Sequence, residues 1–423
     1  MARRHRVKIV VIGSGLIGLT SAYFLRRSGH EVTVLDRQEG SGLETSFANG
    51  ALLTPSMAEP WNAPGCWRVL LASLGRSDAA LQLHFKTLPS LAGWGIKFLR
   101  NSSPGRYQSN ALSNLRLALY SLKMMETLRQ ETGIEYGRNP RGSLRVFRDV
   151  AALDRAFAGA EHLLARSLSF RRLSSAQCVE LEPALAPIAG QLAGGIHYEI
   201  DEIGDAHRFC VGLTEHARRL GVEFRFGTAV SALEMRSSRV TAVASGRERF
   251  VADRYIMAAC SYSTPLLRQA SIRLPVRPAK GYSVTFEAPQ GPGSLRTPIV
   301  DDHLHAAIVP LPGALRTVGT AEFAGFDRTL NPDRIGNLKR LMQELLPQES
   351  VDPTTAKPWC GLRAMSADGV PIIGATAVPN LLVNTGHGHL GWTMAAGSAK
   401  LLTDLVNGAA TALDPASYAL ARF

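Results

Sequence analysis

The sequence predicts an α/β protein with a Rossmann-type dinucleotide-binding domain and a second domain of β-sheet and helices, both discontinuous. Three observations lead to this fold class. A β-branched apolar run, a glycine-rich turn and an apolar-periodic helix open the chain at residues 8–27. Segments of alternating hydrophobicity occupy residues 221–259 and 276–320. A further glycine-rich turn and helix follow at residues 386–408.

The start of the chain carries a dinucleotide-binding signature. A strand is predicted over Lys8–Ile12, and after a G-x-G-x-x-G turn a helix continues until Ser28 and Gly29. A second strand over Glu31–Leu35 ends in Asp36. This acidic residue lies roughly twenty residues beyond the glycines, where a carboxylate can accept hydrogen bonds from a ribose.

Each glycine of this turn has a physical task. Gly13 permits the turn, Gly15 lets the backbone approach a pyrophosphate, and Gly18 allows helix and strand to pack closely. The N-terminus of the helix then faces the phosphates, because its free N–H groups and dipole favour negative charge. The glycines alone do not distinguish NAD from FAD, so an NAD-dependent dehydrogenase remains an alternative.

The composition excludes several classes of protein. With 423 residues, 19% charged and 45% hydrophobic, the chain is typical of a soluble protein with two or three domains. Its five cysteines form no C-x-x-C pair, so neither a metal site nor a disulfide reductase is expected. The net charge of +12 is spread thinly, which argues against nucleic acid and favours an anionic membrane surface or substrate. No signal peptide precedes the first strand, so a cytoplasmic location is expected.

Changes of pattern divide the chain into segments. A loop rich in Gly, Pro, Ser and Asn occupies residues 42–65, and loops of such length are usually functional. A helical pattern then runs to about Thr132 and ends at Gly133. The expected dinucleotide-binding domain comprises residues 1–60, 185–265 and 356–423, and the expected substrate domain comprises residues 61–184 and 266–355.

The C-terminal part carries a second glycine-rich site. A strand over Leu381–Asn384 leads into a turn with Gly386, Gly388 and Gly391, where a backbone can lie against a flat ligand. The helix that follows, at residues 392–406, aims its N-terminus at that ligand. A reduced flavin carries negative charge at its N1 and C2=O edge, which a helix N-terminus stabilises.

Five motifs together resemble the D-amino acid dehydrogenase family, the bacterial branch of the FAD-dependent D-amino acid oxidase fold that also includes glycine oxidase and sarcosine oxidase. They read VIGSGLIGLTSAYFLRRSGHEVTVLDR, LETSFANG, PWNAPG, GLRAMSADGVPIIG and NTGHGHLGWTMAAGS. The likeness runs from Val7 to about Leu413. It implies a tightly held FAD. FAD is expected to be bound non-covalently, because Cys360 lies one residue from the position at which sarcosine oxidases attach the flavin.

The resemblance also assigns FAD-binding residues. Ser46, Asn49 and Gly50 are expected beside the flavin. Val230, on a strand of an inserted sheet, is expected to contact the adenine through its backbone, with a plain core valine as the alternative. Cys260 stands where the family usually has a glycine. The remaining expected contacts are Val10, Ile12, Gly13, Ser14, Gly15, Leu16, Ile17, Gly18, Asp36, Arg37, Gly386, Gly388, Leu390, Gly391, Trp392 and Thr393.

The implied reaction is oxidative deamination of a D-amino acid to a 2-oxo acid and ammonia, with hydride passing from the α-carbon to flavin N5. Arg363 matches the arginine that binds the substrate carboxylate in relatives, and a guanidinium can do so bidentately. Tyr282 resembles a family tyrosine that lines the substrate cavity, with a core tyrosine as the alternative. His387 and His389 flank the flavin loop and are candidates for contact with flavin or substrate.

The electron acceptor decides between a dehydrogenase and an oxidase. Residues 60–100 hold Trp61, Trp67 and Trp94 interleaved with basic residues, a pattern that suits a membrane interface. We therefore expect docking on the cytoplasmic face of the inner membrane, near a quinone, with ordinary helices that bury their tryptophans as the alternative. The alternatives are an oxidase of the same fold that acts on glycine, sarcosine or a D-proline-type imino acid with oxygen, and a basic binding protein whose nucleotide fold is only structural.

Overall fold

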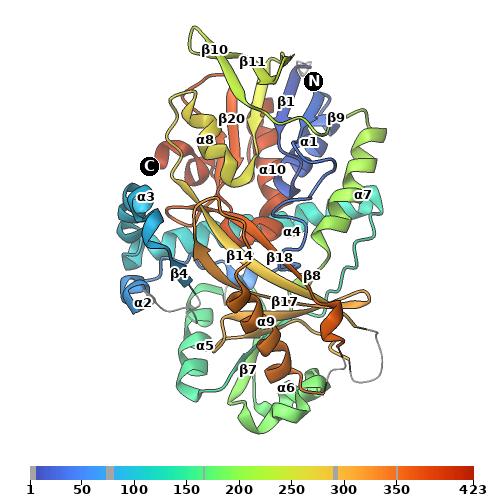
Figure 1. Cartoon of the computed structure of the whole chain (residues 1–423), viewed down its shortest axis with the longest axis vertical. Coiled ribbons are helices and arrows are strands. Elements are labelled where there is room, and N and C mark those ends of the chain that lie inside the picture. The colour runs from blue at the N-terminus through green and yellow to red at the C-terminus, as the bar shows by residue number, and fades with distance from the viewer. Residues whose placement is uncertain (1–5, 73–80, 165–166, 289–293, 349–350) are drawn as a thin grey trace.

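The computed structural model describes residues 6–72, 81–164, 167–288, 294–348 and 351–423. Two large sheets organise the molecule (Figure 1). A six-stranded sheet lies at the end that carries the N-terminus, and a nine-stranded sheet lies in the middle and at the opposite end. The two sheets enclose the cavity that is described below.

The six-stranded sheet is a Rossmann-type sheet with β1 near its centre. β1 and β2 have the predicted bounds, and the two are parallel because α1 connects them on one face. The predicted return strand and the C-terminal strand also join this sheet in parallel. In order the strands are β19 (Ile372–Ala375), β20 (Leu381–Thr385), β13 (Arg254–Met257), β1 (Lys8–Ile12), β2 (Glu31–Leu35) and β9 (Glu223–Arg225).

Four helices pack around this sheet. α1 and α10 lie against each other, and α10 also packs on the long helix α4. α4 and α10 end at Gly133 and Gly408, which have φ of 63° and 61°, as the sequence predicted from these glycines. The four are α1 (Leu16–Arg27), α4 (Pro104–Thr132), α7 (Ala206–Arg219) and α10 (Gly391–Asn407).

The nine-stranded sheet forms the floor of the second domain. One of its faces packs on α9 (Pro332–Leu345) through a large apolar cluster. In order its strands are β18 (Lys357–Ser366), β14 (Val276–Glu287), β17 (Ala314–Phe323), β16 (Ala306–Leu311), β15 (Ile299–Asp301), β5 (Ser143–Phe147), β7 (Gly194–Tyr198) and β6 (Phe170–Leu173), and β4 (Leu81–Leu83) pairs with β17.

Two strands join the second sheet although the predicted ranges place them in the dinucleotide-binding domain. β7 pairs with β5 and β6, and β18 pairs with β14. Conversely, α4 packs on α10, although its range was assigned to the substrate domain. A hydrophobic pattern identifies a strand or helix but not the sheet that it joins. The domain ranges therefore stay a prediction.

Smaller elements complete the fold. The predicted antiparallel sheet consists of β10 (Ala232–Arg236), β11 (Arg239–Ser245) and β12 (Glu248–Phe250). The other elements are α2 (Cys66–Ala72), α3 (Leu88–Arg100), α5 (Val150–Leu164), α6 (Ser175–Leu181), α8 (Ser263–Arg268) and the short pair β3 (Leu52–Leu53) and β8 (Glu202–Ile203). Among the described residues, no helix is both long and apolar enough to cross a membrane.

Candidate active site

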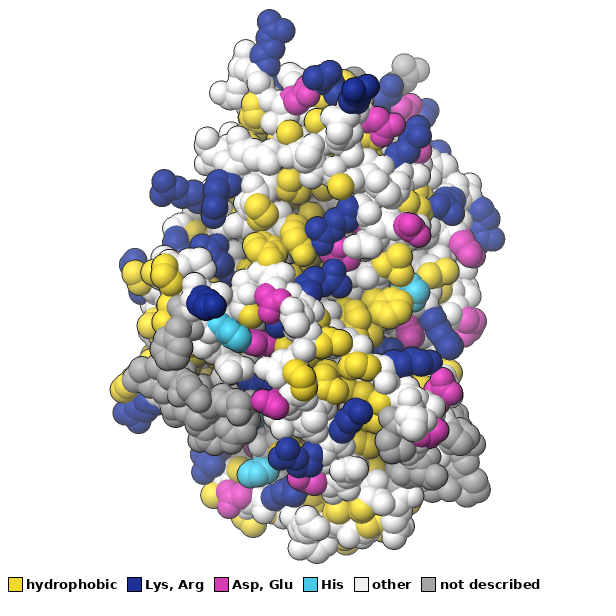
Figure 2. All heavy atoms as spheres, in the orientation of Figure 1, with side chains coloured by type: hydrophobic (Ala, Val, Ile, Leu, Met, Phe, Trp, Pro, Cys, Tyr) yellow, Lys and Arg dark blue, Asp and Glu magenta, His cyan; other side chains and the backbone are white. Residues whose placement is uncertain are grey.

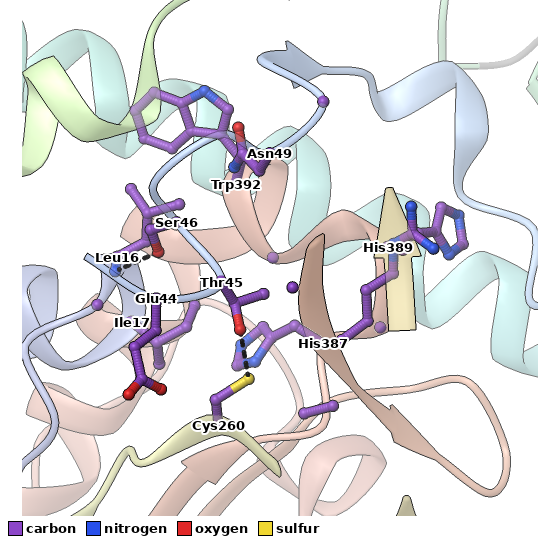
Figure 3. Close-up of a pocket in the computed structure, with 18 of the residues that line it drawn as sticks. Leu16, Ile17, Glu44, Thr45, Ser46, Asn49, Cys260, His387, His389 and Trp392 are labelled. Atoms are coloured by element: carbon purple, nitrogen blue, oxygen red, sulfur yellow. Dashed lines mark hydrogen bonds between the residues drawn. The ribbon is translucent and has the colours of Figure 1, made fainter. Parts of the chain in front are cut away.

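A cavity of about 960 Å³ runs between the two sheets. Ligand pockets typically measure about 300–1,000 Å³, so this one is large enough for a dinucleotide together with a small substrate. Its walls come from the turn between β1 and α1, the loop at residues 42–54, the turn at residues 387–392 and the facing side of β14, β17 and β18. Figure 3 labels residues of the first three of these segments around the cavity.

The first glycine turn has the geometry that a pyrophosphate site needs. Gly13 has φ of 106°, and a Cβ there would lie 2.6 Å from the carbonyl oxygen of Ala258. A Cβ on Gly18 would lie 1.9 Å from the carbonyl oxygen of Gly13. Gly15 borders the cavity, and a Cβ there would lie 3.4 Å from the Ser46 hydroxyl, an ordinary contact. The N-terminus of α1 opens at this point, which suits an anion.

Asp36 is fixed by the turn that precedes α1. Its Oδ2 accepts hydrogen bonds from the backbone N and the hydroxyl of Ser14, at 2.6 and 2.7 Å, and its Oδ1 accepts one from the N of Gln38. A carboxylate offers about four acceptor sites, so one remains for a ribose hydroxyl. Arg37 lies beside it, with its guanidinium carbon 3.8 Å from the centre of the Tyr262 ring.

The loop at residues 45–51 is fastened from both domains. Ser46 Oγ accepts a hydrogen bond from the N of Leu16, which Figure 3 shows as a dashed line. From the second sheet, Ser283 donates to the carbonyl oxygen of Ala48, and the buried Arg316 donates to that of Asn49. Neither Ser283 nor Arg316 was predicted, because no local motif connects them to this loop.

The predicted FAD-binding residues fall into two groups. Those that line the cavity are Ile12, Gly13, Gly15, Leu16, Ile17, Asp36, Arg37, Ser46, Asn49, Gly50, Val230, Gly388, Gly391 and Trp392. Those that lie behind the lining are Val10, Ser14, Gly18, Gly386, Leu390 and Thr393. Val230 lies two residues before β10, so its predicted place on a strand was wrong.

Cys260 adopts a backbone conformation that favours glycine. It lines the cavity with φ of 51°, at the position where the resemblance implies a glycine. Its thiol donates to the carbonyl oxygen of Leu362 at 3.3 Å and lies 3.8 Å from the Thr45 hydroxyl (Figure 3). The side chain therefore points to neighbouring polar atoms while the backbone keeps the geometry of a glycine.

This conformation leads to a prediction. Replacing Cys260 by valine is expected to lower the free energy of unfolding by about 1–3 kcal/mol, because a β-branched residue is strained at positive φ. Cys260→Gly is the matched control, since glycine adopts this φ without strain. Urea unfolding of both variants measures the difference. Equal stability of the two would contradict the expectation.

Arg363 lies on β18 and lines the cavity. Its Nη1 donates to the carbonyl oxygen of Thr320 at 3.1 Å, and its guanidinium carbon lies 5.7 Å from the centre of the Trp61 ring. Burial lowers the pKa of Arg363 to about 10, which leaves it charged at neutral pH. Among the residues that the structure describes, no carboxylate forms an ion pair with it. A cation in this state is available for an anion in the cavity.

Tyr282 borders the cavity, as predicted, while its ring packs in the apolar cluster on the α9 side of the sheet. It lies opposite Cys360 on β18, on the other face of the sheet from Arg363. Its hydroxyl donates to Glu322, and its ring packs in the cluster beneath α9. Burial and the nearby Glu322 raise the pKa of Tyr282. Cys360 shares this face and donates to the carbonyl oxygen of Arg328, which agrees with a non-covalent flavin.

The two histidines of the C-terminal turn line the cavity as neutral rings. Burial lowers the pKa of His387 to about 3, and its Nε2 forms a hydrogen bond with Ser398 Oγ at 3.1 Å. Burial, and then the charge of Arg363, lower the pKa of His389 to about 4. His389 Nε2 donates to the carbonyl oxygen of Met57, and its ring stacks on Trp61 at 5.5 Å. Trp61 thereby connects His389 with Arg363.

A buried carboxyl group, that of Asp201, lies next to Ser56 in the cavity wall. Asp201 is 1% exposed and accepts hydrogen bonds from the hydroxyls of Ser56 and Ser143 and from the N of Ser56. Burial raises its pKa from the ordinary 3.8 to about 7. Since Ser56 lines the cavity, the charge of Asp201 is coupled to the geometry of the wall.

The raised pKa of Asp201 predicts a pH-dependent stability. Below pH 4 the Asp201 carboxyl group is protonated in both the folded and the unfolded protein, so its raised pKa does not change the free energy of unfolding. As pH rises from 4 to about 7, the unfolded protein loses this proton more readily than the folded protein, and the free energy of unfolding falls. Asp201→Asn removes this cost, so at pH 8 its free energy of unfolding is expected to exceed that of the wild type by up to about 4 kcal/mol. The gap should close at pH 4. A constant difference from pH 4 to 8 would refute the raised pKa.

The arrangement fits FAD. The glycine turn leaves room for a pyrophosphate where side chains would clash, Asp36 offers an acceptor for the ribose, and the loop at residues 45–51 faces the C-terminal turn across the cavity. The sequence matches the family described as FAD dependent oxidoreductase over residues 8–405.

Individual relatives agree with this match. A D-amino acid dehydrogenase from Paramagnetospirillum magneticum is 43% identical over 418 residues, which cover 99% of both chains. One from Allorhizobium ampelinum is 40% identical over 99% of both chains. Among solved structures, L-proline dehydrogenase from P. horikoshii superposes with a TM-score of 0.77 at 16% identity over 98% of this chain and 97% of its own. Glycine oxidase from Geobacillus kaustophilus gives 0.76 at 23% identity over 99% of both. The chain therefore belongs to the family of FAD-dependent oxidoreductases, with the fold that these structures share.

Proposed function

We propose that the protein oxidises D-amino acids at the α-carbon to 2-oxo acids and ammonia, and passes the electrons to a quinone. The observation that carries this proposal is Arg363, a half-buried guanidinium in the cavity whose charge has no ion-pair partner among the described residues. Relatives with 43% and 40% identity are named D-amino acid dehydrogenases, which supports the choice of substrate.

The residues of this chain bind and align the substrate. Arg363 holds the carboxylate through two parallel N–H···O bonds, and the one Nη1 bond to Thr320 fixes the plane of the guanidinium. When bound, FAD supplies the acceptor for the two electrons and the hydrogen of the α-carbon. Trp61 and His389 stack on each other in the cavity wall and border the substrate space beside Arg363.

Neither histidine is suited to act as a general base. With pKa values near 3 and 4, His387 and His389 are neutral and weakly basic at physiological pH. Because His389 donates through Nε2 to Met57, its lone pair is on Nδ1, where it can accept a hydrogen bond from the substrate amine. Catalysis then depends mainly on alignment, once the amine has lost its extra proton to solvent.

The membrane contact concerns α2 and α3. Trp94 and Phe98 are buried, and Trp61 lines the cavity, so only Trp67 of the three tryptophans is exposed, at 49%. Large exposed apolar side chains nevertheless gather here beside exposed basic ones: Trp67, Leu88, Ile96 and Leu99 with Arg68, Lys86 and Arg100. Figure 2 shows hydrophobic and basic side chains intermixed on the side where Figure 1 places α3. Such a surface suits an anionic lipid layer. Residues 73–80 of the predicted interface lie outside the described residues.

Two experiments test the proposal. A panel of D- and L-amino acids with a dye acceptor, read beside the visible spectrum, should show turnover of D-amino acids and little hydrogen peroxide in air. Peroxide production at the rate of turnover would favour an oxidase.

The membrane contact is tested separately with lipid vesicles. The protein should co-sediment with anionic vesicles in a salt-sensitive way, and Ile96→Asp should weaken this co-sedimentation. Equal sedimentation with neutral vesicles, or none, would refute the contact.

A further inference from the structure

The second sheet contains an irregularity next to Arg363. Lys280 on β14 pairs with Glu322 on β17, and Tyr282 pairs with Gly319. Between these pairs, Gly281 alone faces the two residues Thr320 and Ala321. This is a β-bulge, a feature that redirects backbone and side chains and that occurs often beside active sites.

Gly281 leaves the space that the guanidinium fills. A Cβ at this position would lie 2.3 Å from Cζ of Arg363, 2.4 Å from Nη2 and 2.5 Å from Nη1. The φ of Gly281 is not in the left-handed region, so its backbone does not require glycine. Glycine is needed here because the flat guanidinium of Arg363 lies against the backbone of residue 281, in the space that a side chain would occupy.

Thr320 holds the same group from the other strand. Its carbonyl oxygen accepts the hydrogen bond from Nη1 of Arg363. Its φ is 55°, which is strained for a β-branched residue, and its buried hydroxyl has no hydrogen-bond partner among the described residues. Strain of this kind, at about 1–3 kcal/mol per residue, persists mainly where function requires the geometry.

We propose that the bulge is a positioning device for Arg363, with Gly281 as its positioning residue. Gly281 does not itself contact the substrate. It lets the guanidinium lie flat against β14 while Thr320 fixes its rotation, so that the remaining N–H groups face the cavity. The inference rests on the proposed function, because it takes the group that Arg363 binds to be the substrate carboxylate.

The test uses the FAD-loaded protein and propionate, which has a carboxylate but no amine. Its binding is followed by the change in flavin absorption. Gly281→Ala is expected to weaken propionate binding by about tenfold or more and to raise KM for the D-amino acid more than it lowers kcat, because a displaced guanidinium loses one of its two bonds. In an Arg363→Ala background, Gly281→Ala should change propionate binding less than twofold, since no guanidinium remains to be displaced.

Stability gives a second measurement that does not require the single variant to bind ligand. Gly281→Ala should destabilise the protein when Arg363 is present, even to the point of preventing folding. The double variant should unfold at the same urea concentration as Arg363→Ala, because the new methyl group fills the space that the arginine vacates. Rescue also differs: added guanidinium ion should restore propionate binding to Arg363→Ala but not to the double variant.

The outcomes distinguish a failure of the positioning role of Gly281 from a failure of the proposed carboxylate site at Arg363. If Gly281→Ala weakens propionate binding or stability equally in both backgrounds, or leaves both unchanged, the positioning role is refuted. If Arg363→Ala itself binds propionate as tightly as the wild type, the proposed carboxylate site has failed, whatever Gly281 does.

Discussion

Replacing Arg363 by alanine is expected to lower kcat/KM for every D-amino acid substrate by about 10²–10³-fold. Truncating one partner of a desolvated, hydrogen-bonded charge pair costs about 2–5 kcal/mol, and each 1.36 kcal/mol is a factor of ten. Both KM and kcat should change, because the contact orients the α-carbon as well as binding the carboxylate. Steady-state kinetics with a dye acceptor measures the effect.

The same variant should be no less stable than the wild type. Burial already lowers the pKa of Arg363 to about 10, and no carboxylate among the described residues pairs with it, so the ligand-free protein gains little from this charge. Its FAD content should be unchanged, since Arg363 donates to Thr320 and lies over Trp61, and neither of these is a predicted FAD-binding residue. Arg363→Lys keeps the charge but not the planar fork, and should recover only part of the activity. Full activity in Arg363→Lys would show that bidentate binding is not required.

The sequence was informative where structure is local. The first strand, turn and helix, and the glycine turn before α10, are specified by contiguous residues whose spacing and turn chemistry act within a few residues. The same holds for the ends of α4 and α10, where Gly133 and Gly408 supply the left-handed conformation. For this reason most of the predicted FAD-binding residues lie in or directly behind the cavity wall.

The second sheet was less predictable because its contacts are set by register. Whether a side chain on β14 faces the cavity or α9 depends on pairing with β17 and β18, and a shift by one residue exchanges the faces. Tyr282 borders the cavity, but its hydroxyl bonds Glu322 on the α9 side of the sheet, whereas Arg363 on β18 faces the cavity. The bulge opposite Gly281 and the bond from Arg316 to the loop of Asn49 join distant segments without a sequence signal.

The glycines of the first turn lead to the other prediction with a large effect. Gly18→Ala would place a methyl group 1.9 Å from the carbonyl oxygen of Gly13, a backbone atom that cannot move aside without separating α1 from β1. We expect loss of FAD together with a loss of several kcal/mol of unfolding free energy, as for severe overpacking. FAD released on denaturation, measured per protein chain, and urea unfolding quantify both effects.

Gly15→Ala is the matched control, because it should change FAD affinity without changing the stability of the apoprotein. Its φ of −69° suits alanine, and the nearest atom to the new methyl group would be Ser46 Oγ at 3.4 Å, an ordinary contact. The apoprotein should therefore unfold as the wild type does. The methyl group would occupy the space where the backbone approaches the pyrophosphate, so FAD affinity is expected to fall by about 10- to 100-fold. If Gly15→Ala keeps FAD at wild-type affinity while Gly18→Ala unfolds, the turn contributes to the fold only, and the phosphates lie elsewhere in the cavity.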